Sequence, residues 1–323
     1  MKRAWTIFLK GAGMGAADAV PGVSGGTIAF ITGIYAELIE TIKRFGPGAL
    51  SAWQQGGARR LTTHLNLRFL LPLLAGIAIS LISVAHLITY LMAAQPVVLS
   101  GFFFGLVAAS ALVIRRDLSH WRLWHILPLL LGLISVKGLA LLMPLVGLLG
   151  NESLMLVVAG AIAISAMLLP GVSGSFLLLA MGLYGTVMQA IKSLDFTVIL
   201  VFGGGCALGL FGFSRLLSWL LRRFYTATLQ FLIGMILGAL PILWPWQELV
   251  SYRVGPQEQL IPMGHRFLLP HEYAQLTGDS AQPFIVLAAM LAGLILVLMV
   301  GRKAPPEGAQ EPAHVRKKDE CDA

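Results

Sequence analysis

The sequence predicts an all-α polytopic membrane protein with about six transmembrane helices and two re-entrant helical hairpins, arranged as an inverted-topology repeat. Three observations support this fold class. The composition is 57% hydrophobic and only 12% charged, the apolar residues form long stretches, and one glycine-rich motif occurs twice. Soluble domains carry about 25% charged residues, so this composition is suited to a bilayer.

Six apolar stretches are long enough to cross a membrane, because a helical crossing needs about 20 residues. They lie at 68–92, 97–114, 124–149, 196–220, 226–246 and 282–301. Two further apolar regions, 4–42 and 153–191, are each interrupted by the string Pro-Gly-Val-Ser-Gly. The two arms of each region are short for a crossing. They predict a hairpin that enters the membrane and leaves on the same side.

The basic residues agree with this topology. Of the 23 lysines and arginines, all but four fall on the same side as the N-terminus; the exceptions are Lys137, Lys192, Arg253 and Arg266. The positive-inside rule therefore predicts six crossings, two hairpins and both termini in the cytoplasm. The net charge of +8 reflects topology, and no nucleic-acid partner is expected.

The two interrupted regions are related in sequence. Residues 21–45 and 170–194 align without a gap with nine identities in 25 positions. Each copy is followed by three crossings, and an odd number of crossings inverts the second copy relative to the first. We expect a first repeat over 1–150 and a second over 151–301. The polar tail, 302–323, is expected to be disordered and cytoplasmic.

The repeated motif is typical of a helix N-terminus that binds an anion. Ser24 and Ser173 can cap the helices that follow, and the small residues after them leave backbone N–H groups accessible. In an inverted repeat the two hairpin tips would meet near the bilayer midplane and could hold one phosphate group. The alternative is that glycine and serine only permit close helix packing or a sharp turn.

Charged residues inside apolar segments mark further candidates. Lys137 lies deep in its crossing and could attract a phosphate or pair with an acid. Asp18 precedes the first motif, has Met167 as its repeat counterpart, and could pair with Lys137, carry a proton or cap the turn. Glu37 and Arg215 are candidates for a coupling or accessory role, with snorkelling as the alternative for Arg215.

Catalytic patterns are absent from the sequence. There is no metal-ligand spacing and no nucleotide-binding loop, and neither Ser24 nor Ser173 has a base nearby in sequence. We therefore predict no enzyme, no cofactor and no metal.

The stretch GAGMGAADAVPGVSGGTIAFITGIYAELIE and its weaker copy LLPGVSGSFLLLAMGLYGTVMQAI resemble the bacterial polyprenyl-phosphate (undecaprenyl-phosphate) translocase family, formerly a membrane domain of unknown function. The resemblance covers the chain up to about residue 301. It implies a multi-pass flippase of the bacterial cytoplasmic (inner) membrane that recycles undecaprenyl phosphate, the lipid carrier of cell-wall (peptidoglycan) synthesis. A small-anion channel or exchanger is the alternative function.

The candidate substrate-binding residues follow from the motif positions. They are Asp18, Pro21, Gly22, Ser24, Gly25, Gly26, Thr27 and Lys137, with Pro170, Gly171, Ser173, Gly174 and Ser175 in the second copy. Ser175 replaces Gly26 between the copies, so the two tips need not contribute equally. The expected partners are the lipid phosphate and the bilayer, with protons as a candidate coupling ion. A homo-oligomer is left open.

Overall fold

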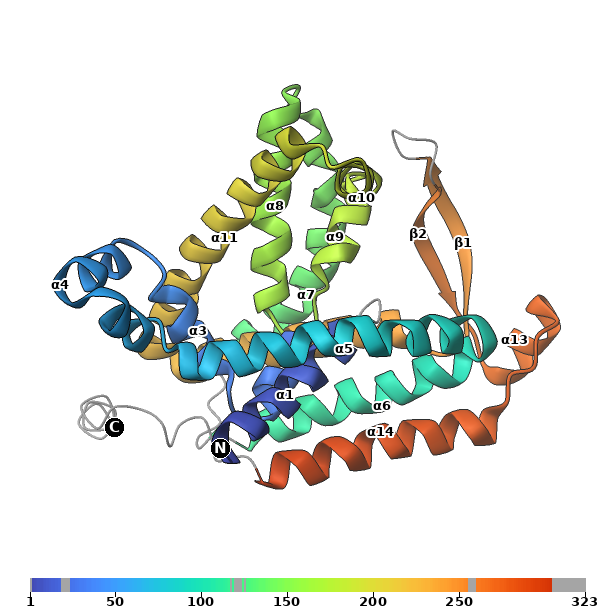
Figure 1. Cartoon of the computed structure of the whole chain (residues 1–323). Coiled ribbons are helices and arrows are strands. Elements are labelled where there is room, and N and C mark those ends of the chain that lie inside the picture. Colours follow the sequence, from blue (N-terminus) through green and yellow to red (C-terminus); the bar gives the residue numbers. More distant parts are fainter. Residues whose placement is uncertain are drawn as a thin grey trace.

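The computed structural model describes residues 2–18, 24–116, 118, 124, 126–254 and 260–303. Helices form almost all of this part of the chain (Figure 1). The first half contains α1 (Lys2–Asp18), α2 (Gly25–Ile31), α3 (Tyr35–Lys43), α4 (Pro47–His64), α5 (Leu67–Ala94), α6 (Pro96–Arg115), α7 (Ile126–Leu142) and the 3₁₀ helix η2 (Met143–Leu148). The second half contains α8 (Glu152–Leu168), α9 (Gly174–Ala180), α10 (Tyr184–Ser193), α11 (Phe196–Arg223), α12 (Tyr225–Ala239), the 3₁₀ helix η3 (Leu240–Leu243), β1 (Gln247–Val254), β2 (Leu260–Phe267), α13 (Pro270–Thr277) and α14 (Pro283–Lys303).

The predicted fold class is confirmed: the chain is a helical, multi-pass membrane protein. Within the described residues five helices are long and apolar enough to cross a bilayer, or six if the bent pair α9 and α10 counts as one span. The five are α5, α6, α11, α12 with η3, and α14. The remaining predicted crossing is α7, a shorter apolar helix that continues into η2.

The outgoing arm of each interrupted region differs from the prediction, because each is bent rather than a single helix. The turn between α2 and α3 contains Gly33 with φ 68°, and the turn between α9 and α10 contains Gly182 with φ 76°. Glycine adopts this left-handed conformation without strain and ends the preceding helix. The bend between α9 and α10 is 107°.

The described residues between the last two predicted crossings form regular structure. Strands β1 and β2 pair antiparallel and are followed by α13. Two indole N–H groups attach this region to the helices: Trp244 Nε1 donates to the Leu268 carbonyl (3.1 Å), and Trp246 Nε1 donates to the Ala281 carbonyl (2.8 Å). In Figure 1 the strands stand to one side of the helices. The segment 47–64, between the first interrupted region and the first predicted crossing, forms α4.

The long helices pack in pairs: α1 with α5, α8 with α11, α6 with α14, and α7 with α12. At each interface a glycine lets the two backbones approach, since an added β-carbon would overlap a carbonyl oxygen of the partner helix. These glycines correspond between the halves: Gly11 with Gly160, Gly76 with Gly205, Gly105 with Gly234, and Gly293 with Gly132.

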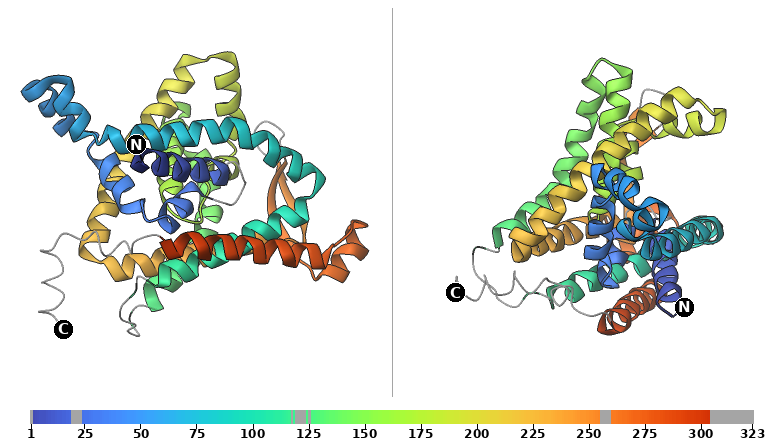
Figure 2. Two further views of the ribbon diagram at one scale, coloured as in Figure 1. Left: turned by 60° about the horizontal axis from the view of Figure 1, so that its bottom comes forward. Right: turned by 60° about the vertical axis from the view of Figure 1, so that its left-hand side comes forward.

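The carbonyls that these glycines approach correspond as well. Gly105 faces the Met290 carbonyl, whereas Gly234 faces the Leu129 carbonyl. In the first two pairs of helices both partners come from one half. In α6–α14 and α7–α12, one helix comes from each half, so the halves are interlocked. Figure 2 shows α14 alongside α6.

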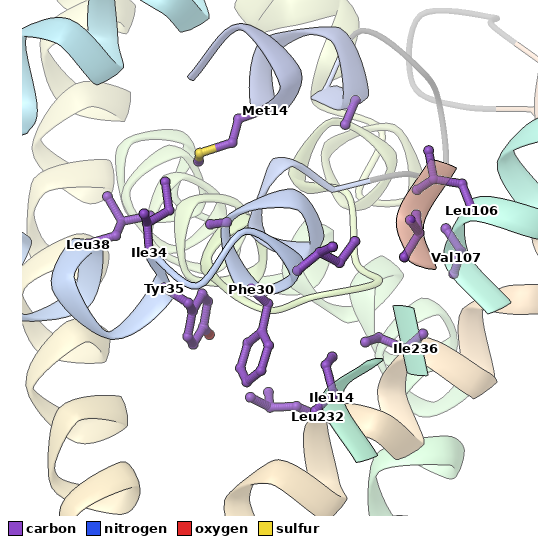
Figure 3. Close-up of a cluster of buried hydrophobic side chains, with 14 of the residues drawn as sticks. Met14, Phe30, Ile34, Tyr35, Leu38, Leu106, Val107, Ile114, Leu232 and Ile236 are labelled. Carbon is purple, nitrogen blue, oxygen red and sulfur yellow. The ribbon is translucent and has the colours of Figure 1, made fainter. Parts of the chain in front are cut away.

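The first interrupted region lies in the apolar core. Ile31, Tyr35 and Ile39 are at most 2% exposed, and the rings of Phe30 and Tyr35 are 4.9 Å apart. Figure 3 shows these rings beside Leu232 of α12, with Ile114 of α6 on the same side. The end of α2 and the start of α3 are therefore packed against helices of both halves.

Candidate functional site

The first motif copy caps α2 as the sequence predicts. Ser24 is 1% exposed and stands at the N-cap, where its hydroxyl oxygen accepts a hydrogen bond from the Gly26 N–H (3.2 Å). Gly25, Gly26 and Thr27 form the first turn of α2 and are buried. Pro21 and Gly22, the other predicted residues of this copy, lie outside the described residues.

Asp18, the last residue of α1, occupies the start of α2. Its Oδ1 accepts a hydrogen bond from the Gly25 N–H at 2.6 Å. A β-carbon on Gly25 would lie 2.5 Å from Asp18 Oδ2, so only glycine leaves room for this carboxylate. A negative group at a helix N-terminus is electrostatically favourable. The N–H groups expected to be accessible at this tip are therefore already bonded within the protein.

The structure brings the two motif copies together. The Ser24 hydroxyl lies 3.4 Å from the Met167 carbonyl oxygen and 3.3 Å from that of Leu169. Thr27 Oγ1 accepts a hydrogen bond from the Gly171 N–H at 3.2 Å. Residues 143 to 145 positions apart in the chain thus form one buried polar junction.

Tyr35 strengthens this junction, which sequence reasoning does not anticipate. Its hydroxyl donates to the Leu168 carbonyl at 2.7 Å, and its side chain is fully buried. The last carbonyls of α8 have no partner within their own helix, so hydroxyls of the first copy satisfy them.

The hydrogen bond between Thr27 and Gly171 gives a first testable prediction. A Thr27→Val substitution keeps the side-chain shape but leaves the buried Gly171 N–H without its acceptor, which costs about 1–3 kcal/mol. We expect a clearly lower midpoint of thermal unfolding for the purified protein in detergent. Thr62→Val, at an exposed hydroxyl that bonds within α4, is the matched control and should leave the midpoint nearly unchanged. Equal midpoints for the two variants would contradict the contact.

The second motif copy is arranged differently from the first. Ser173 precedes α9 but makes no capping hydrogen bond with its side chain within the described residues. Its hydroxyl instead lies 2.8 Å from that of Ser175. Pro170, Gly171 and Gly174 are buried. The second tip therefore presents two hydroxyl groups whose hydrogen bonds, among the residues that the structure describes, are to one another.

A small pocket lies beside Ser173. Its walls are apolar and come from three places: Val136 of α7, Phe176 and Leu177 of α9, and Ile242 of η3. Hydrogen bonds to a charged group are stronger in such surroundings than in water.

Lys137 follows Val136 directly in α7. Its side chain is exposed, and within the described ranges it has neither a hydrogen bond nor an ion pair. Asp18 does not form the ion pair with Lys137 that the sequence left open, because its carboxylate bonds to the Gly25 N–H. Lys137 is therefore an exposed cation one position beyond Val136, which lines the pocket of the second tip.

Glu37 and Arg215 lie away from the tips. Glu37 Oε1 accepts hydrogen bonds from Arg3 Nη2 (2.9 Å) and Asn66 Nδ2 (3.1 Å), so the base that the sequence did not reveal comes from the start of α1. Arg215 Nη1 donates to the Phe211 carbonyl of its own helix at 2.9 Å, and its guanidinium lies beside Gly46. The structure therefore groups neither residue with the motif copies.

Two comparisons relate the chain to known proteins. It is 44% identical to a polyprenyl-phosphate transporter of Vibrio cholerae, over 91% of this chain and 94% of that protein. It is 32% identical to a polyprenyl-phosphate transporter of Staphylococcus aureus, over 75% of this chain and 86% of that protein. No solved structure matches the chain.

A family described as undecaprenyl phosphate translocase-like matches residues 14–260. This match includes both motif copies, Lys137 and the helices that surround them. The relatives are named as transporters, in agreement with the prediction that the chain is not an enzyme. The resemblance found in the sequence is thus confirmed, and the chain belongs to the undecaprenyl phosphate translocase-like family.

Proposed function

We propose that this protein moves a polyprenyl phosphate, in particular undecaprenyl phosphate, across the bacterial cytoplasmic membrane and that the phosphate group binds between the two motif copies. The observation that carries the proposal is the junction in which Ser24 and Thr27 contact residues 167–171. Polar backbone at membrane depth is tolerated where it is buried in protein or lines a cavity. The names of the relatives support the choice of substrate.

The proposed topology is an inverted repeat with both termini in the cytoplasm. Residues 1–150 and 151–301 form its halves, and their matching glycine contacts support this division. Each motif copy is the tip of a re-entrant hairpin, one entering from each side. The tail, 302–323, stays in the cytoplasm.

The second tip is the first contact for the phosphate. Ser173 and Ser175 can each donate one hydroxyl hydrogen to an anion. Lys137, one position beyond the pocket residue Val136, is proposed to supply positive charge on this side of the protein. The first tip is held by Asp18, whose carboxylate has to leave the Gly25 N–H before a second anion can bind there. Protonation of Asp18 would remove its negative charge, which gives protons a role as the coupling ion.

The proposed direction is from the outer to the inner leaflet, which returns the spent carrier of cell-wall synthesis. The isoprenoid chain stays in lipid while the phosphate passes between the tips. This arrangement differs from that of a small-anion channel, which needs a narrow axial pore and no access from lipid.

The experiment that tests the proposal uses purified protein in liposomes that contain undecaprenyl phosphate. A phosphatase added outside the vesicles reports the fraction of undecaprenyl phosphate in their outer leaflet over time, with and without a proton gradient. We expect exchange between leaflets to be much faster than in vesicles without protein, and chloride efflux to be unchanged. Exchange no faster than in empty vesicles under both conditions would overturn the proposal. Rapid chloride efflux without lipid exchange would favour the anion channel.

A further inference from the structure

The two hairpins are packed differently even though the long helices around them pair in the same way. In α3, Tyr35 is 0% and Ile39 is 1% exposed, whereas their counterparts in α10, Tyr184 and Met188, are 38% and 36% exposed. The matching glycine contacts mean that the surrounding helices alone do not impose this difference. One hairpin is closed against the protein and the other is not.

Polar contacts hold α3 against α11 at the end of the hairpin away from the tip. Lys43 Nζ donates to the Ser218 hydroxyl at 3.2 Å, and that hydroxyl donates to Glu40 Oε1. Lys43 and Glu40 also form an ion pair at 3.4 Å. Ser218 is 2% exposed. We call Glu40, Lys43 and Ser218 the α3–α11 latch; Figure 1 shows the two helices side by side.

The repeat assigns a counterpart to each latch residue. The offset of 149 between the motif copies relates Glu40 to Gln189 and Lys43 to Lys192. The offset of 129 between Gly76 of α5 and Gly205 of α11 relates Ser218 to position 89 of α5, a threonine. Gln189 and Lys192 are exposed. Figure 1 and the right-hand view of Figure 2 show α10 standing apart from α5.

We propose that the α3–α11 latch and its counterpart between α10 and α5 close in alternation, and that the structure is the state with the latch closed and the counterpart open. This inference rests on the proposed transport function. A phosphate held between the tips has to reach one side of the membrane at a time, and a repeat related by inversion provides two such states. Glu40, Lys43 and Ser218 then act as gate residues, and so do Gln189, Lys192 and Thr89.

The chemistry of the two gates is unequal. The closed latch combines a carboxylate, an ammonium and a hydroxyl, and hydrogen bonds to charged groups are the stronger kind. The counterpart has an amide, an ammonium and a hydroxyl, with no carboxylate. The state with the latch closed is therefore favoured at rest, and bound substrate has to shift the population toward the other state.

Cysteine cross-linking tests the alternation, in protein whose native Cys206 and Cys321 have been replaced by alanine. Oxidation of a Glu40→Cys/Ser218→Cys pair is expected to join α3 to α11 and to stop lipid exchange in the liposome assay, and reduction is expected to restore it. A Thr89→Cys/Gln189→Cys pair is expected to cross-link during exchange, and its oxidation should also stop exchange. The matched control is Val113→Cys/Gly301→Cys, because a β-carbon on Gly301 would lie 3.4 Å from that of Val113. This pair joins α6 to α14, which move together, so its oxidation should leave exchange unchanged.

Weakening the latch gives a second readout that does not depend on transport. In the Thr89→Cys/Gln189→Cys background, Glu40→Gln is expected to raise the cross-linking rate at least about fivefold, because a charged partner of Ser218 and Lys43 is lost. Continued exchange with positions 40 and 218 joined would overturn the proposal. So would a Thr89→Cys/Gln189→Cys pair that never cross-links while lipid moves.

The cross-linking result also separates the two proposals. If the wild type moves no lipid phosphate but Glu40→Gln still raises cross-linking at positions 89 and 189, the alternation stands and the substrate assignment fails. If lipid moves but Glu40→Gln has no effect on that rate, the substrate assignment stands and the latch fails.

Discussion

Replacing Gly105 of α6 by leucine is expected to prevent the protein from reaching its folded state. A β-carbon at this position would overlap the Met290 carbonyl of α14, and two packed backbones cannot move apart locally. Overpacking at one core position costs about 1–3 kcal/mol and more where only backbone surrounds it, so we expect a loss of at least about 3 kcal/mol. Gly234→Leu, at the corresponding contact between α12 and α7, is expected to do the same.

Thermal unfolding of the purified variants and the yield of monodisperse protein measure this effect. The control is Gly212→Leu in α11, where an added β-carbon meets nothing within 4 Å. That variant should unfold at the wild-type temperature, because its side chain extends into lipid. A Gly105→Leu protein as stable as Gly212→Leu would show that α6 and α14 do not approach as described.

Replacing Ser173 and Ser175 together by alanine is expected to reduce lipid exchange at least about tenfold. Each hydroxyl is proposed to donate to the phosphate, and a hydrogen bond to a charged group is worth about 1.5–3 kcal/mol, with 1.4 kcal/mol corresponding to a factor of ten. The two hydroxyls bond to one another when no substrate is bound. Removing both therefore leaves no buried polar group without a hydrogen-bond partner. The variant should therefore fold as well as the wild type.

The liposome assay with undecaprenyl phosphate measures this change. The matched control is Ser83→Ala, which removes an exposed hydroxyl that bonds only to the Ile79 carbonyl of its own helix. It should exchange lipid at the wild-type rate. If Ser173→Ala/Ser175→Ala kept full activity while remaining folded, the phosphate would have to bind elsewhere.

Much of the architecture can be predicted from the sequence. Hydropathy alone places α5, α6, α11 and α14 within three residues of their ends, because a crossing has to be long and apolar. The motif also predicts the cap before α2 and the contact between the two copies, whereas the cap predicted before α9 lacks its side-chain hydrogen bond within the described residues. Hydropathy does not report local backbone geometry. It therefore predicts neither the division of the third crossing into α7 and η2 nor the bends at Gly33 and Gly182.

The individual hydrogen bonds that form the junction cannot be predicted from the sequence. Thr27 and Gly171, or Tyr35 and Leu168, are far apart in the chain, and only the packing of both halves determines which hydroxyl meets which backbone group. For Asp18 the sequence left three roles open, and the contact in the structure matches the capping alternative. A carboxylate near a helix start can bond to that start itself, and here it does so with Gly25 in preference to a distant lysine.

Glu40 illustrates the limit of reasoning from neighbouring residues. Its spacing from Lys43 predicts a surface ion pair within one helix, and that ion pair is present. The buried Ser218, which turns the pair into a contact between halves, is 178 positions away in the chain. Sequence spacing identifies the local partner but not the distant one.

The interlocking of the halves also has a consequence for how the protein is made. The glycine face of α6 receives its partner, α14, only after almost the whole second half has been synthesised and inserted. Until then the small-residue surface of α6 is not covered by its partner and is accessible to other helices in the membrane. The same holds for α7 until α12 has been inserted. Domains generally fold as units during synthesis, the N-terminal one first, whereas here each half of the chain packs a long helix against one from the other half. The two halves are therefore obligate partners in assembly.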